Sequence, residues 1–574
     1  FLYSIIAFLY NICMEIQNNI SLLTRGEVWD SFDENKSPLE TAILAKERLN
    51  EKIVQSLCYT SIMLNNEKVR AYLQLIYSEE SGDSMPTVLV LPNAGYNPDY
   101  TSMIDALIKK GYCVCLLDYA GIFDFDLYQT RFPSSLKYAQ HPFCRSTLAK
   151  LHGNTVKDTA WYHWMYLIKR CLAVLKTNTL VDYTKLSIIG FETGADLAWI
   201  IAGEEKELSA VIPIGGGGAI CKSHPTLQEN DYDSEAATNA FAIGVSAEIY
   251  AKTMDADLLF IPFTNSRYFS FSYAKDIFSV ANSKNKQVLV DVGLGKQTSE
   301  STFNYLLSWL DSHYAKKLPK VKEVSTSATA NDGKLSLNIV SKDVPSEISL
   351  FYSSGKGTLY NSLWLEENRF TNTGKNTYSI NIPVDDASVP INYFATLSYD
   401  NGLKISTTLE QIVASEYGIV KTKSNSQKAD HILYTSRSDF CPFRAETKSA
   451  VLYDDVLEIK ESPQKIKGVT SRVGNLYIPK SSNMVSFASA SSMLSCDVYS
   501  EEETSFVFSF RTCPNFERYT YTVTVPGSTS WQKLVLKVSD FKASEGKSLA
   551  KLSDGFIFYI ESPNGCLFNN LLLI

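Results

Sequence analysis

Histidine is scarce in this chain, with 6 among 574 residues. Imidazole is the side chain that most often moves protons at neutral pH, so its rarity restricts the chemistry available. His163 is predicted to be a packing residue of a helix. A candidate site lies at a turn over residues 190–194, and His313 and His431 are expected to lie too far from it to take part. The other three fall in predicted insertions, from which they could fold over that site: His141, His152 and His224.

An excess of basic charge is also lacking. Lys and Arg number 54 against 62 Asp and Glu, which gives a formal net charge of −8 and a pI near 5.5. Nucleic-acid binding depends on a basic patch or stripe, and no run of Lys and Arg is dense enough to supply one. The composition therefore argues against a nucleic-acid partner.

Cysteine spacings typical of metal sites are absent. None of the 11 cysteines forms a C-x-x-C pair or a Cys/His ligand pattern, so the sequence predicts no metal and no cofactor. Cys113 and Cys115 share one face of a predicted strand about 6–7 Å apart, near the upper limit for a disulfide. Most cysteines are expected to be reduced core thiols, which favours a reducing, cytoplasmic location.

Apolar runs long enough to cross a membrane are missing as well, so no stable membrane insertion is expected. The stretch Phe1 to Cys13 is mostly apolar, but it lacks a basic flank and leads to no A-x-A-like cleavage site. Two interpretations stay open. Either Met14 is the biological start, or the stretch is a signal peptide truncated at its front and the protein is secreted.

Between Lys52 and Lys317, short runs that are apolar at nearly every position alternate with helical patterns. Such strands are buried on both faces, as in a parallel sheet covered by helices. The alternation predicts an α/β doubly wound domain over residues 52–317, after a lead-in over residues 1–51. The predicted strands are Val88 to Leu91, Cys113 to Leu117, Leu186 to Ile189, Ala210 to Ile214, Leu258 to Ile261 and Val288 to Val292. A helix is predicted from the apolar stripe Trp161, Trp164, Ile168, Leu172 and Leu175.

Two insertions interrupt this domain, Tyr119 to Lys157 and Gly215 to Asn239. Insertions at such places usually cover the carboxyl edge of the sheet, so they predict a lid or specificity surface. Gly215 to Gly218 could cradle a phosphate, but no helix with Lys-Ser or Lys-Thr comes after it, so a flexible strand exit is preferred.

Period-two alternation replaces the α/β pattern after Lys317. Residues 318–415 predict a β-sandwich of immunoglobulin or fibronectin type, and residues 416–574 predict a second all-β unit. Tyr519 and Tyr521 of the second unit could stack on sugar rings, but core packing is the preferred interpretation. The strands predicted here include Leu335 to Ile339, Ile348 to Tyr352, Tyr378 to Ile382, Ile391 to Leu397, Phe506 to Phe510 and Tyr519 to Val523.

The segment Ser187 to Asp196 reads S-I-I-G-F-E-T-G-A-D, an apolar strand, a Gly-bounded turn and the start of a helix. This is the setting of the G-x-S-x-G elbow, which presents a nucleophilic Ser above a parallel sheet. Here Phe191, Glu192 and Thr193 stand between the glycines, and Glu192 occupies the position of the Ser. The chemistry of the domain depends on that replacement.

Residues from about Thr24 to Lys317 resemble bacterial α/β-hydrolases of the acetyl-xylan-esterase, dienelactone-hydrolase and prolyl-oligopeptidase-like group. The resemblance implies an α/β-hydrolase fold with an esterase-like site. The tail resembles carbohydrate-binding, galactose-binding-like jelly rolls through Trp531 to Phe541 and Leu567 to Asn570. The motifs that carry the first resemblance are Leu23 to Trp29, Val88 to Tyr96, the elbow, and Phe260 to Ser266.

The resemblance implies a catalytic triad, and this chain departs from it at all three positions. Glu192 replaces the nucleophile, Ser266 stands where a T-N-D turn would supply the acid, and Leu294 stands where the His is expected. Asn93 occupies the usual His position of the oxyanion segment, although backbone N–H donors would survive that change. The vestigial cleft would be lined by Asn93, Ala94, Gly95, Phe191, Glu192 and Thr193.

A carboxylate at the elbow has a parallel in dehalogenase- and epoxide-hydrolase-like members, which use an Asp there. The ester it forms must be hydrolysed by a His-activated water, and no His lies near the last predicted strand. Glu is one methylene longer than Asp, so its oxygen is misplaced by over ~1 Å, enough to cost on the order of 10²-fold in rate. Asp118 ends a predicted strand, and loop capping is preferred to cleft lining.

The sequence supports three functional hypotheses. The preferred one is a catalytically inactive α/β-hydrolase-like protein with a binding, scaffolding or regulatory role, whose old cleft holds a small ester-like or glycan ligand. The alternatives are an active esterase or peptidase that uses other residues, and a carbohydrate-binding protein that acts through the tail. The oligomeric state does not follow from the sequence.

Overall fold

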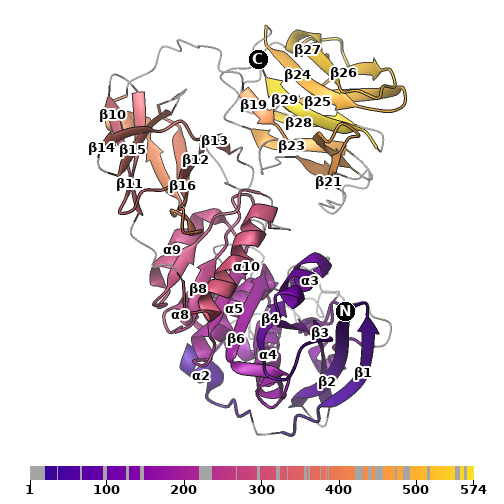
Figure 1. Cartoon of the computed structure of the whole chain (residues 1–574), viewed down its shortest axis with the longest axis vertical. Helices are drawn as coiled ribbons and strands as arrows, with labels where there is room; N and C mark the ends of the chain where they lie inside the picture. The colour runs from indigo at the N-terminus through magenta and orange to yellow at the C-terminus, as the bar shows by residue number, and fades with distance from the viewer. Residues whose placement is uncertain are drawn as a thin grey trace, which may run out of the picture. The chain divides into compact units, whose positions relative to one another are not determined.

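A computed structural model shows two compact units, residues 1–291 with 302–321, and residues 292–301 with 322–574 (Figure 1). The residues that the structure describes are 20–34, 37–64, 67–94, 100–123, 128–141, 148–218, 235–266, 268–293, 298–318, 324–331, 334–354, 359, 362, 364–374, 376–382, 384, 387–419, 431–436, 443–446, 457–471, 475–481, 491–512, 517–549, 556–561 and 565–573. The apolar stretch Phe1 to Cys13 lies outside them.

One mixed sheet forms the centre of the first unit. Its strands are β1 (Ala42–Leu49), β2 (Lys52–Leu64), β3 (Glu67–Ser78), β4 (Met85–Leu91), β5 (Cys113–Asp118), β6 (Val181–Phe191), β7 (Ala210–Ile214), β8 (Asp257–Phe260) and β9 (Lys286–Val288). Their spatial order is β1-β2-β3-β5-β4-β6-β7-β8-β9, with β1 to β3 antiparallel and the others parallel. From β2 onward this is the strand order of the α/β-hydrolase fold, which confirms the predicted fold class.

The antiparallel edge of the sheet was not foreseen from the sequence. β1 falls inside the predicted lead-in over residues 1–51 and pairs with β2, so the sheet begins before Lys52. Nearly every residue of β1 is exposed, and it therefore lacks the apolar run that marks a strand buried on both faces. The predicted strands from Val88 to Val292 all correspond to observed strands or to their immediate continuation.

Helices cover the sheet on its two faces. α3 (Thr101–Lys109) and α10 (Glu300–Tyr314) pack on the face to which Val88 and Ile189 contribute. The fully buried Leu89 and Ile188 alternate with them and point to the opposite face. α4 (Ala160–Lys176) and α5 (Thr193–Glu204) contact β6 and each other. The sheet is thus the middle layer of three, as the doubly wound prediction requires.

The remaining helices among the described residues of the first unit are short. They are α2 (Arg25–Trp29), α7 (Glu235–Gly244), α8 (Ala247–Ala251) and α9 (Ala274–Val280), with the 3₁₀ turns η1 (Ser134–Ala139), η3 (Val156–Asp158) and η5 (Phe271–Tyr273). The predicted Trp-rich helix is α4. Its stripe, including Trp161 and Trp164, is fully buried, and the Thr159 hydroxyl caps its first turn by accepting from Tyr162 N at 3.2 Å. No helix in the described part of the chain is long and apolar enough to span a bilayer.

The second unit contains antiparallel sheets that pair face to face. The first pair is built from β10 (Val324–Asn331), β11 (Lys334–Ser341), β12 (Glu347–Ser354), β13 (Leu365–Glu367), β14 (Thr371–Gly374), β15 (Thr377–Ile382), β16 (Pro390–Ser398), β17 (Lys404–Ser406) and β18 (Glu410–Val413), followed by η7 (Ala414–Tyr417). Sheet β10-β11-β15-β14 and sheet β13-β12-β16-β17 share one apolar core, in which Leu337 and Ile380 meet Leu350 and Ile391. These sheets form a β-sandwich, and its immunoglobulin or fibronectin type stays a prediction.

A second pair of sheets comes next in the chain. Its strands are β19 (His431–Tyr434), β20 (Arg444–Glu446), β21 (Leu457–Glu461), β22 (Lys467–Ser471), β23 (Asn475–Ser481), β24 (Met493–Tyr499), β25 (Thr504–Thr512), β26 (Arg518–Val525), β27 (Gln532–Lys537), β28 (Phe556–Glu561) and β29 (Leu567–Leu573), with η9 (Val538–Asp540). Phe506 of one sheet packs edge-on against Phe568 of the other at 5.2 Å. Tyr519 is 4% exposed and belongs to the core, and Tyr521 is partly buried with its ring 5.7 Å from that of Phe541.

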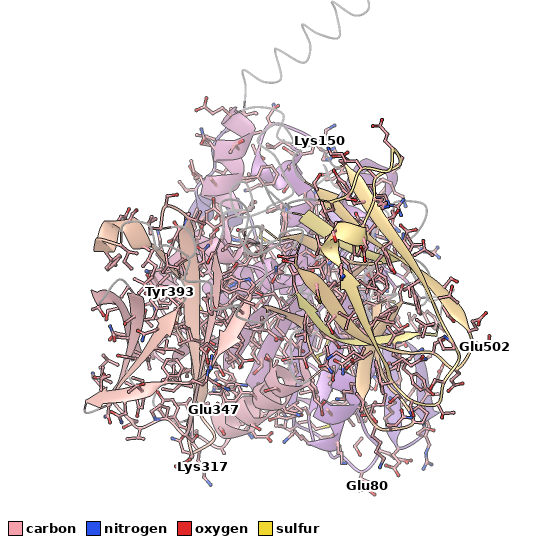
Figure 2. All side chains as sticks on the ribbon, turned by 90° about the horizontal axis from the view of Figure 1, so that it is seen from above. Glu80, Lys150, Lys317, Glu347, Tyr393 and Glu502 are labelled. Carbon is pink, nitrogen blue, oxygen red and sulfur yellow. The ribbon has the colours of Figure 1, made fainter. Side chains whose placement is uncertain are left out.

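Many charged side chains of both units are exposed. Glu80, Glu347 and Glu502, labelled in Figure 2, are all exposed. The interior is apolar in contrast: Cys113 and Cys115 are buried free thiols, and burial raises the pKa of both. The disulfide that their spacing would just permit is therefore not formed.

Candidate functional site

The turn between β6 and α5 has the backbone of a nucleophile elbow. Glu192 adopts φ +48° and ψ −108°, a conformation that non-glycine residues rarely occupy. Such a residue stores on the order of 1–3 kcal/mol of strain, which persists only where the surroundings fix it. This strained strand–turn–helix is what the G-x-S-x-G motif produces. The elbow geometry is therefore present, with Glu192 at the position where the motif has Ser.

Three glycines let the backbone close around this turn. A Cβ on Gly190 would lie 2.1 Å from Gly194 O, and one on Gly194 would lie 2.1 Å from Leu91 O. A Cβ on Gly216 would lie 2.4 Å from Glu192 O. The run Gly215 to Gly218 follows the end of β7, as a strand exit does, and its Gly216 packs against the elbow.

Glu192 is held by the loop that follows β4. Its side chain is half-buried, and its Oε2 accepts a hydrogen bond from Asn93 Nδ2. The Thr193 hydroxyl donates to Asn93 Oδ1 at 3.0 Å. The Asn93 amide thus bridges Glu192 to Thr193 and fixes the carboxylate where a hydrolase would present its nucleophile.

The predicted oxyanion segment is used differently from what the resemblance implies. Ala94 N donates to Thr193 Oγ1 at 2.6 Å, so this backbone donor does not remain available as expected. Tyr119 lies within hydrogen-bonding distance of the same hydroxyl, at 2.9 Å, and donates to Pro92 O at 2.6 Å. Gly95 lies outside the described residues. The elbow and the β4 loop therefore satisfy each other's polar groups.

Ser266, at the position of the triad acid, serves its own turn. It is 2% exposed, and its Oγ accepts hydrogen bonds from Tyr268 N at 3.1 Å and Phe269 N at 3.0 Å. A hydroxyl held in this way cannot orient a histidine as a carboxylate does. Leu294, at the position of the triad His, lies outside the described residues.

A buried carboxyl that the sequence analysis missed connects the elbow helix to the loop that contains Ser266. Asp196, in the first turn of α5, accepts a hydrogen bond from Tyr268 OH at 2.5 Å. Burial raises its pKa to about 8, and this effect outweighs the hydrogen bonds from Tyr268 and from Gly217 N. The sequence could have indicated this buried carboxyl only through the position of an acidic residue in a mostly apolar helix.

Other predicted residues have structural roles. His163 is hydrogen-bonded to Tyr138 OH at 2.8 Å, and burial lowers its pKa to about 4, so it is neutral and packed as predicted. Asp118 accepts from Ile122 N at 2.7 Å and Thr130 N at 2.9 Å, which confirms loop capping, while burial raises its pKa to about 7. His224 lies outside the described residues.

Of the six residues predicted to line the vestigial cleft, the structure brings four into direct contact: Asn93, Ala94, Glu192 and Thr193. Phe191 lies beside them, with its ring 5.0 Å from that of Tyr100. Within the described ranges, no three His, Cys, Asp or Glu side chains converge to hold a metal ion.

Comparison with known proteins gives a likeness of fold over about half the chain. An acetyl xylan esterase from Paenibacillus sp. R4 is 13% identical over 52% of this chain and 98% of its own, with a TM-score of 0.42. Acetyl xylan esterase 1 from Thermoanaerobacterium sp. JW/SL YS485 is 13% identical over 52% and 95%, with a TM-score of 0.40. A dienelactone hydrolase-like promiscuous phosphotriesterase from metagenomic libraries is 16% identical over 47% and 99%, with a TM-score of 0.31. No family model and no curated protein matches the chain.

Substitution of Gly194 tests the close packing of the elbow. Gly194→Ala places a Cβ against the Leu91 carbonyl, and overpacking of this kind costs about 1–3 kcal/mol or more. We expect a clear fall in the melting temperature by calorimetry. Gly26→Ala is the matched control, because no atom lies within 4 Å of its added Cβ. Equal melting temperatures for the two variants would show that the elbow is looser than described.

The raised pKa of Asp196 predicts how the stability of the fold changes with pH. A carboxyl with a raised folded-state pKa stabilises the fold below its unfolded pKa, and that contribution is lost as pH rises toward about 8. The free energy of unfolding of the wild type should therefore fall between about pH 4 and pH 8. That of Asp196→Asn should fall by less, because its amide does not titrate. Thermal unfolding across this range measures the difference. Asp255→Asn, at an exposed ion pair with Lys206, should keep the wild-type profile, and the same profile for Asp196→Asn would contradict the assignment.

Proposed function

We propose that this α/β-hydrolase-fold protein does not hydrolyse esters at its elbow but binds a ligand there. The observation that carries the proposal is the Glu192 carboxylate, which stands in the strained nucleophile position and is held by Asn93. An acyl-transfer site needs a nucleophile, a base and oxyanion donors together. At this elbow the serine is replaced, and the Ala94 N–H is bonded within the protein.

Charge indicates what such a site would prefer. A half-buried carboxylate attracts hydrogen-bond donors and cations, and it repels carboxylates and the negative charge that develops on an ester during attack. An ester group offers only acceptors, whereas a glycan offers many hydroxyl donors. Of the two ligand classes expected from the sequence, the neutral hydroxyl-rich one therefore fits Glu192 better.

The tail domain is a weaker candidate for glycan recognition. Of the two aromatic residues singled out in the sequence, Tyr519 is buried and is not available to stack on a sugar ring, and Tyr521 is partly buried with its ring against Phe541. A glycan site in the tail would need other residues. The elbow therefore remains the preferred site of ligand binding.

Placing a serine at position 192 tests whether the elbow lacks the base and acid of a catalytic triad. Glu192→Ser should hydrolyse 4-nitrophenyl acetate no faster than the parent protein, because no partner at the acid position can orient a base. Glu192→Ala should likewise leave the parent rate unchanged. A large gain in Glu192→Ser would mean that a histidine reaches the elbow. Loss of turnover in Glu192→Ala would mean that the carboxylate itself is catalytic.

Ligand binding is tested with neutral and anionic sugars. Cellobiose or xylobiose should bind in a calorimetric titration, and Glu192→Gln should weaken that binding by about tenfold or more, equivalent to about 1.4 kcal/mol. Glucuronic acid should bind more weakly than either. Glu80→Gln, at an exposed position, is the matched control. If neither disaccharide binds, or if Glu192→Gln binds as the parent does, the proposal is wrong.

A further inference from the structure

A cluster of Ser, His and Asp lies at the end of the sheet opposite to the elbow. Ser209 immediately precedes β7, Asp257 begins β8, and His313 lies in the last turn of α10. His313 Nδ1 lies 3.0 Å from Asp257 Oδ2, and its Nε2 lies 2.6 Å from Ser209 Oγ. These are the nucleophile–base and base–orienter hydrogen bonds of a serine triad.

The imidazole is fixed in the orientation that this chemistry needs. Asp257 accepts only from an Nδ1–H, so the Nε2 lone pair faces the Ser209 hydroxyl. The other Asp257 oxygen accepts from Asn285 Nδ2 at 2.8 Å, which holds the carboxylate. The Trp309 ring lies nearly parallel to the His313 ring, with centroids 5.6 Å apart and 6° between planes. His313 is therefore held from two sides.

The backbone around Ser209 is equally fixed. Ser209 N donates to Leu186 O at 2.9 Å, and Ser209 O accepts from Asp257 N at 3.1 Å. The serine thus links the middle of β6 to the amino ends of its parallel neighbours β7 and β8. The elbow follows the carboxyl end of β6, so the elbow and the Ser209 cluster lie toward opposite ends of the parallel strands. Ser209 is partly exposed, as a residue that a small reagent modifies must be.

We propose that Ser209 is a His-activated nucleophile that accepts acyl or phosphonyl groups from small activated esters and fluorophosphonates. Its Oγ forms a bond to the carbonyl carbon or phosphorus while the hydroxyl proton passes to His313 Nε2. The bond to the phenolate or fluoride leaving group breaks, and that group departs with the electron pair. His313 then returns its proton to the leaving group or to solvent.

The environment of Ser209 slows release of the acyl group. In serine hydrolases a backbone N–H commonly stabilises the oxyanion, but the N–H of Ser209 is bonded to Leu186 O. Loss of one such donor costs about 10²–10³-fold in rate. The missing donor slows acylation and deacylation alike, but an activated phenolate leaves readily, whereas water must then attack an ordinary serine ester. Deacylation is therefore the slower step, and the acyl group accumulates on the serine. The expected behaviour with 4-nitrophenyl acetate is a burst of about one equivalent followed by slow turnover.

Covalent labelling of the intact chain tests this directly. After incubation with a fluorophosphonate probe, peptide mass spectrometry should place the adduct on Ser209 in the wild-type protein, with no variant needed. Ser209→Ala should lose the label, and His313→Gln should slow labelling by about 10²-fold or more, since the general base is removed. Asp257→Asn should slow it as well.

The control is Ser308→Ala, a serine of the same helix as His313 whose hydroxyl only donates to Asn304 O. It should label at the wild-type rate. Failure of the folded wild-type protein to label at Ser209 would overturn the proposal, as would equal labelling rates for His313→Gln and wild type. Circular dichroism and melting temperatures establish that each variant is folded.

Discussion

The close approach of backbones around Gly190, Gly194 and Gly216 is the constraint on which the candidate site depends. With no Cβ at these positions, β6, α5 and the loop after β7 meet at distances that no other residue permits. That packing holds Glu192 at a positive φ, a conformation it would not keep alone. The position of the carboxylate is thus set by glycines and by a strained turn, independently of whether the residue there can react.

The polar groups around the elbow are bonded to one another more completely than the motif suggests. Asn93 bridges Glu192 and Thr193, and the Thr193 hydroxyl accepts a hydrogen bond from Ala94 N. Asp196 and Tyr268 form a second link below it. These contacts favour a fixed binding surface over a site that must stabilise charge only during a reaction.

Buried strands and the two glycines that bound the elbow, Gly190 and Gly194, could be predicted from the sequence, whereas the close approach at Gly216 and the long-range polar contacts could not. Val88 to Leu91 and Leu186 to Ile189 are apolar at nearly every position because both of their faces are covered. β1 is exposed on both faces and carries no such pattern. Asp196 meets Tyr268 across 72 residues, and Ser209 meets His313 across 104, so only the fold brings these partners together.

The central claim is that Glu192 holds a ligand and does not attack one. A carboxylate nucleophile that attacks 4-nitrophenyl acetate releases 4-nitrophenolate and forms an acetyl–glutamyl anhydride. Over many turnovers in ¹⁸O-labelled water, attack of water on the glutamyl carbonyl of this anhydride leaves the heavy isotope in the carboxylate. The most direct measurement is mass spectrometry of the peptide that contains Glu192 after incubation with 4-nitrophenyl acetate in labelled water. We predict no ¹⁸O in the Glu192 carboxylate; incorporation at that residue would contradict the account.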